Sequence, residues 1–122
     1  DDPSYFFMAE AFNMPGGADA IEKIPEGGKY PRAIVCGSDE VAVGVLSVLN
    51  RRKVSVPEEV AVIGMDNIEI AEYTNPPLTT MNVQKKNMGY RAVEMIVNNT
   101  CGQGDDAIRI MLPANIVNRS SC

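Results

Sequence analysis

The stretch AIVCGSDEVAVGVLSVLNRRKVSVPEEVAVIG, residues 33–64, decides the fold class of this chain. It opens with the uninterrupted apolar run Ala33–Cys36, which is typical of a strand covered on both faces. Ser38 is a preferred N-cap residue, and apolar side chains then recur at helical spacing as far as Leu49. A second apolar run follows at Val60–Ile63. Strand, helix and strand at this spacing predict a right-handed βαβ unit with parallel strands.

The flanking segments predict further elements of an α/β fold with a parallel sheet flanked by helices. Strands are expected at Tyr5–Phe12, Leu78–Val83, Ile108–Leu112 and Ile116–Arg119. Helical segments are expected at Ala18–Ile24, Glu69–Tyr73 and Asn87–Asn99. The last helix directs five apolar side chains inward at helical spacing, namely Met88, Ala92, Val93, Ile96 and Val97.

Composition excludes several classes of protein. The 122 residues are 45% apolar, which suits one modest globular domain. No apolar run approaches the roughly 18 residues that a membrane span needs, so no membrane partner is expected. The net charge is −5, and Arg51–Lys53 is one short basic cluster, so this segment is not expected to bind nucleic acid strongly. The chain has no histidine, which excludes histidine-based catalytic triads and histidine metal sites.

Three cysteines point to a reducing compartment. Cys36, Cys101 and Cys122 are odd in number and lack the spacing of metal ligands, so no metal or cofactor is expected. Cys36 ends an apolar run and is expected to be a small buried hydrophobic residue. Unpaired cysteines are typical of the cytoplasm, which is the predicted location.

Polar residues follow both strands of the βαβ unit. Ser38 and Asp39 come after the first strand, and Asp66 after the second. In an open α/β sheet, ligands bind beyond the carboxyl ends of the strands. Carboxylates and amides there suit a sugar or another polyol, and Phe12 and Asn13 add an aromatic face and an amide.

Each of these residues also has a purely structural interpretation. Ser38 can act only as the N-cap, and Asp39 only as an acid at the positive end of a helix. Asp66 and Asn67 can be turn formers, because both tolerate unusual backbone angles. Phe12 can be a core residue. Spacing alone does not decide between these interpretations.

The same segments resemble the C-terminal lobe of regulators of the lactose-repressor family. The matching stretches are PRAIVCGSDEVAVGVL (31–46), VPEEVAVIGMDN (56–67) and IEIAEYTNPPLTTMNVQKKNMG (68–89). The ending LPANIVNRSSC (112–122) is similar to the family's last strand and its Arg-Ser-Ser/Thr finish. The pieces occur in the family's order and spacing, and the resemblance covers essentially the whole chain.

The resemblance implies a fold like that of periplasmic sugar-binding proteins, with an effector cleft between two α/β lobes. Residues 1–83 would form part of the C-terminal lobe. Residues 84–113 would cross to the N-terminal lobe, and residues 114–122 would return. The family's DNA-binding helix-turn-helix, which normally precedes the lobes, is not among these residues, and neither is most of the N-terminal lobe.

The resemblance also implies site residues. Asp66 matches the family's effector-binding aspartate. Ser38 falls where an effector-binding Asn is common, and Asp39 matches the acid after it. Phe12 falls where an aromatic residue often adjoins the effector, and Lys85 takes a position that is often aromatic. Ser38 and Lys85 depart from the commoner pattern, so the sequence leaves the effector unnamed.

The family forms homodimers through its C-terminal lobes. This implies that Val41, Val45, Tyr73 and Thr74 lie near the contact; the alternative is that the apolar ones are intramolecular core. The apolar face of the helix at Asn87–Asn99 would lack the lobe on which it packs. We therefore expect the isolated chain to repack this helix on itself or on a partner, for which a domain swap is one route.

The sequence thus predicts the sensing and dimerisation part of a transcription repressor that responds to a sugar or similar small molecule. DNA would be bound only through the helix-turn-helix outside these residues. The alternative is a periplasmic or lipid-anchored sugar-binding protein of a transport system. An enzyme is disfavoured, because no nucleophile–base pair, phosphate-binding glycine loop or metal cluster is visible.

Overall fold

The computed structural model describes residues 6–98 and 108–122, and its contacts divide the chain into two units. Unit 1 comprises Asp1–Asn82 and Ile116–Cys122, and unit 2 comprises Val83–Asn115. The assignment of the crossing segment to a second lobe stays a prediction.

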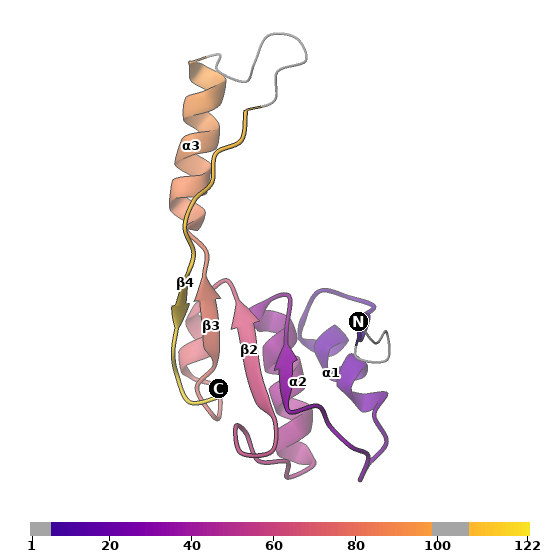
Figure 1. Ribbon diagram of the computed structural model, residues 1–122. Coiled ribbons are helices and arrows are strands. Elements are labelled where there is room, and N and C mark those ends of the chain that lie inside the picture. Colours follow the sequence, from indigo (N-terminus) through magenta and orange to yellow (C-terminus); the bar gives the residue numbers. More distant parts are fainter. Residues whose placement is uncertain (1–5, 99–107) are drawn as a thin grey trace. The chain divides into compact units, whose positions relative to one another are not determined.

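Unit 1 is built on a sheet whose order along its width follows the order along the chain (Figure 1). The strands are β1 (Ala33–Val35), β2 (Ala61–Met65), β3 (Thr79–Asn82) and β4 (Asn115–Val117). β2 runs parallel to both neighbours, with Ala61 opposite Ala33 and Ile63 opposite Thr79. Figure 1 shows β4 pointing against β3, so the predicted parallel sheet ends in one antiparallel strand.

The predicted βαβ unit is confirmed, with α2 (Asp39–Arg51) as its crossover helix. The Ser38 Oγ accepts a hydrogen bond from the Val41 N–H at 3.2 Å, as an N-cap does. Asp39 and Glu40 place negative charge in the first turn, where the helix dipole favours it. The sequence therefore predicted correctly that this helix begins directly after the Ser38 N-cap.

Helix α1 (Met14–Glu22) begins four residues earlier than predicted. The Asn13 side chain accepts from the Gly16 N–H at 3.0 Å, and Pro15 occupies the first turn, where its missing N–H costs nothing. α1 packs closely on α2 (Figure 1). A Cβ at Gly44 would lie 2.0 Å from the Met14 carbonyl oxygen, so the glycine permits this approach.

One core joins α1, α2 and the inner face of the sheet. Its members are Ile21, Ile24, Cys36, Val41, Ala42, Val45, Leu46, Val48, Leu49, Val60, Val62, Ala71 and Leu78. Leu46, Leu49 and Leu78 are among the largest fully buried side chains. Ala71 belongs to η2 (Glu69–Glu72), the helical turn predicted from the sequence. The carboxyl ends of β1 and β2 are thus supported by a packed base.

The strand predicted at Tyr5–Phe12 is wrong for its described residues. Residues 6–12 contain no strand, and Phe6 and Met8 are 73% and 83% exposed. Apolar composition favours a strand, but a strand forms only when a neighbour pairs with it. β1 is also less covered than expected, because Val35 is 80% exposed.

Unit 2 contains helix α3 (Lys85–Val97), which begins two residues before the predicted start. No residue of α3 is buried, and Val93, Ile96 and Val97 are 60%, 70% and 76% exposed. Their predicted inward packing is therefore absent in the described part of this unit. The strand predicted at Ile108–Leu112 is also wrong, since those residues form no strand. Among the described helices, none is both long and apolar enough for a membrane crossing.

Candidate functional site

The candidate site is centred on the turn that follows β2. Asp66 and Asn67 have φ values of 107° and 50°, a left-handed conformation that L-residues adopt at a cost. The Asp66 N–H donates to the Met81 carbonyl at 2.9 Å, and the Asn67 N–H donates to the Thr80 Oγ1 at 3.3 Å. Both residues are half-buried. β3 thus holds the turn at the carboxyl edge of the sheet.

Asp39 lies beneath this turn and is completely buried. Its Oδ1 accepts from the Thr80 hydroxyl at 2.5 Å, and its Oδ2 accepts from the Ile68 N–H at 2.8 Å. A Cβ at Gly64 would stand 2.1 Å from that Oδ1, so the carboxylate fits only against glycine. Asp39 was predicted as an effector contact. Its hydrogen bonds to Thr80 and Ile68 instead hold the turn in place.

Ser38 is also buried, at 6% exposure, with its hydroxyl engaged as the α2 N-cap. Phe12 is 70% exposed, and its ring lies about 3 Å from where a Cβ at Gly37 would stand. An accessible aromatic face thus adjoins the end of β1. Asn13, predicted beside it, is exposed and caps α1.

The prediction from spacing missed the groups that hold the turn from the C-terminal side. The Arg119 Nη2 donates to the Asn67 Oδ1 at 2.9 Å. The buried Ser121 hydroxyl accepts from the Thr79 N–H at 2.8 Å and donates to the Val62 carbonyl at 2.6 Å. The sequence signal for these residues was the Arg-Ser-Ser ending, which was visible only as a family feature.

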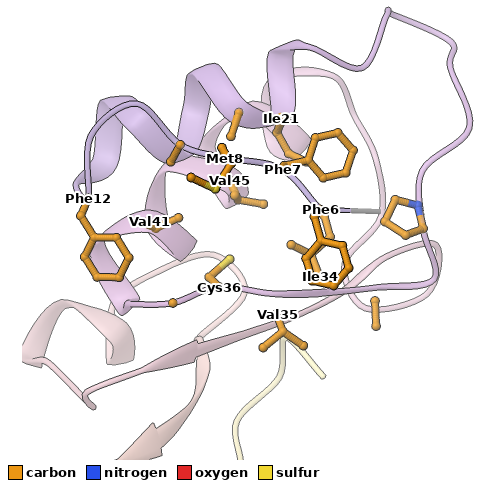
Figure 2. A pocket seen from close by; sticks show the side chains of 15 residues that line it. Phe6, Phe7, Met8, Phe12, Ile21, Ile34, Val35, Cys36, Val41 and Val45 are labelled. Atoms are coloured by element: carbon orange, nitrogen blue, oxygen red, sulfur yellow. The ribbon is translucent and has the colours of Figure 1, made fainter. Parts of the chain in front are cut away.

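A separate apolar hollow of about 630 Å³ lies between β1, α2 and the segment that was predicted as a strand (Figure 2). Phe6, Phe7, Met8, Phe12 and Cys36 are among its lining residues. Figure 2 shows Phe12 at one end and Phe6 and Phe7 toward the other. The lining offers apolar and aromatic contacts, whereas a polyol needs several polar partners.

Cys36 is buried as predicted, at 4% exposure. Burial, and secondarily the negative charge of Asp39, raises the pKa of its thiol to about 12. The thiol is therefore neutral at physiological pH and is a poor nucleophile. Cys101, by contrast, lies outside the described residues.

The remaining predicted residues differ in burial and in the unit to which they belong. Val41 and Val45 are 8% and 3% exposed and belong to the core, which favours the intramolecular alternative for both. Tyr73 is 75% exposed, and Thr74 is half-buried with its hydroxyl donating to the Pro76 carbonyl at 2.8 Å. Lys85 begins α3 in unit 2, so its predicted effector contact stays a prediction.

Within the described ranges, no three acidic or cysteine side chains gather as metal ligands would.

Comparison with known proteins matches residues 3–122 to the periplasmic binding protein-like domain. The chain belongs to this family. It is 31% identical to the ribose operon repressor of Escherichia coli over 98% of its own length, but it spans only 36% of that protein.

Solved structures agree. A putative transcriptional regulator of the lactose-repressor family from Sanguibacter keddieii superposes with a TM-score of 0.86 at 29% identity, over 99% of this chain and 46% of that one. A regulator of the same family from Lactobacillus casei, solved with bound sucrose, gives 0.73 at 26% identity, over 90% and 41%. The predicted resemblance and fold class are confirmed: this chain is part of an effector-binding domain of the lactose-repressor type.

Proposed function

We propose that this chain is the ligand-sensing part of a transcription repressor whose effector is a sugar or a similar small molecule. Asp66 would bind the effector, with Phe12 as a stacking face. Asp39, Thr80 and Arg119 would hold the turn that presents Asp66. The effector would act by binding one arrangement of two lobes better than the other.

The observation that best supports this proposal is the left-handed turn at Asp66 and Asn67, which lies at the carboxyl edge of the sheet. The chain that contains this turn is similar to repressors. A strained conformation at a ligand-binding edge persists when its surroundings hold it, and such strain gathers at binding sites. The similar protein solved with sucrose supports a sugar as the effector class.

The wider assembly is part of the same proposal. We infer a homodimer in which the exposed Tyr73 and the neighbouring Thr74 lie near the contact. DNA would be bound by a helix-turn-helix that precedes the lobes in the longer protein, which would place the protein in the cytoplasm. No enzymatic activity is proposed, since the ribose operon repressor, to which the chain is similar, is a repressor.

The test is thermal unfolding of the intact protein with D-ribose, sucrose and a panel of other mono- and disaccharides. A ligand that binds only the folded state at about 100 times its Kd stabilises it by roughly 2.7 kcal/mol. We expect at least one sugar to raise the Tm, and Asp66→Ala to abolish the shift. Glu58→Ala is the matched control, because it removes an exposed carboxylate before β2 and should leave the shift unchanged.

A panel with no shift for the intact protein would remove sugars as the effector class. Turnover of a sugar that disappears in Asp66→Ala would instead point to an enzyme.

A further inference from the structure

Arg119 gathers three acceptors that come from three separate segments. Its side chain is 12% exposed. Nη1 donates to the Leu78 carbonyl at 2.8 Å, and Nη2 donates to the Asn67 Oδ1 at 2.9 Å and to the Glu72 Oε1 at 3.0 Å. A planar guanidinium with several donors can bind three acceptors at once, whereas a lysine ammonium acts as a flexible point charge.

The backbone that carries Arg119 is itself fastened to the sheet. The Arg119 N–H donates to the Thr79 Oγ1 at 2.9 Å, and the Ser120 N–H donates to the Pro77 carbonyl at 3.0 Å. Ser121 is completely buried, and its carbonyl accepts from the Val62 N–H at 2.7 Å. The guanidinium therefore extends from a rigid base.

Arg119 binds the side chain of a residue whose backbone is strained. Asn67 has a φ of 50°, and it follows Asp66 in the same left-handed region. Without restraint, such a residue relaxes toward the broader allowed regions of backbone space. The bond from Arg119 to the Asn67 side chain opposes that relaxation.

We propose that Arg119 is a positioning residue of the effector site: by holding the Asn67 side chain, it sets the orientation in which the preceding Asp66 meets the ligand. The proposal rests on the proposed function for its purpose. Its geometry is independent of which effector binds. The same guanidinium also binds Glu72, which directly precedes the exposed Tyr73. One side chain therefore contacts both the turn and the segment next to Tyr73.

The first test is amide hydrogen exchange in the intact protein. In Arg119→Met, we expect exchange at Asn67 and Ile68 to rise about tenfold or more, because a hydrogen bond to a charged group is lost. The Val62 and Gly64 amides should stay protected. Arg119→Lys should give an intermediate rise. Arg51→Met is the matched control, since it removes an exposed arginine paired with Glu22 and should leave the turn unchanged.

A double-mutant cycle separates positioning from general support of the fold. Asn67→Gly removes the side-chain acceptor and relieves the left-handed strain. If Arg119 acts through Asn67, Arg119→Lys should change the exchange of Ile68 little in that background. Equal effects of Arg119→Lys in both backgrounds, or a uniform rise across β2, would overturn the proposal. Arg119→Lys and Asn67→Gly decide the matter even if Arg119→Met fails to fold.

Affinity for D-ribose and sucrose is then measured by calorimetry. For a sugar that the wild type binds, Arg119→Lys should weaken the Kd by about fivefold or more, since the aspartate loses its fixed position. An unchanged Kd would overturn the positioning role. If the wild type binds neither sugar, the proposed effector class loses support, while the exchange experiment still decides what Arg119 does.

Discussion

Helices α2 and α3 each have 13 residues and an amphipathic sequence, yet they differ in how much of their surface is buried. Eight residues of α2 are buried, and none of α3 is. α2 packs on α1 and β2, whereas the apolar residues of α3 remain exposed within its own unit. Apolar periodicity thus predicts a helix and its inward face, but burial also requires a partner surface.

The largest expected difference is between matched truncations in the two helices of the 122-residue chain. Leu46→Ala removes a buried side chain of α2 and should lower the free energy of unfolding by about 2–5 kcal/mol. Ile96→Ala, at a position that is 70% exposed in α3, should change it by less than about 0.5 kcal/mol. Urea unfolding at low protein concentration measures both.

The two-lobe prediction can be tested at the same position of α3. In a longer protein that supplies a further lobe, Ile96→Ala should lower the free energy of unfolding, because the side chain would be buried there. In the 122-residue chain, light scattering should show concentration-dependent association that Ile96→Asp reduces. A monomer at all concentrations would rule out self-association through α3.

A pair of glycine substitutions should change stability with opposite signs. Gly64→Ala places a Cβ 2.1 Å from the buried Asp39 Oδ1, whose hydrogen bonds prevent it from moving aside, so a loss of about 1–3 kcal/mol is expected. Gly89→Ala in α3 meets no atom within 4 Å and should stabilise the helix by up to about 1 kcal/mol. Thermal unfolding followed by circular dichroism distinguishes the two; a loss at both positions would show that α3 is covered.

The buried thiol should add a pH dependence to the stability of unit 1. The folded-state pKa of Cys36 is raised from 9.0 to about 12, so the unfolded chain releases this proton first. The contribution of the protonated thiol to the free energy of unfolding is therefore fully present below pH 9. It is lost as the pH rises toward 12, with a slope of up to about 1.4 kcal/mol per pH unit. Urea unfolding of the wild type and Cys36→Ala between pH 8 and 11 should show the steeper fall in the wild type. Parallel curves would contradict the raised pKa.

The smallest expected effect concerns helix capping. Ser38→Ala removes the hydrogen bond to the Val41 N–H and should cost about 1 kcal/mol. Gln84, the N-cap of α3, makes no side-chain capping bond, so Gln84→Ala should change stability by less than about 0.5 kcal/mol. A cost at Gln84 as large as that at Ser38 would show that the two helix starts do not differ in this way.

The sequence predicted the local elements around Ser38 and Val60–Ile63 well, because capping and continuous apolar runs are properties of neighbouring residues. It predicted strands at Tyr5–Phe12 and Ile108–Leu112 that the described residues do not form. A strand depends on a partner that is remote in sequence, and composition does not reveal whether one is present.

The sequence by itself determined the βαβ unit, the edge on which Asp66 lies and the family resemblance. Tertiary structure alone decided what the polar residues do there. Spacing presented Asp39 and Asp66 as similar acids, yet Asp39 is sealed beneath the turn by Thr80 and Ile68. Arg119 reaches Asn67 across 52 positions of the chain. Burial and long-range hydrogen bonds arise only when distant segments pack together, so no local pattern contains them.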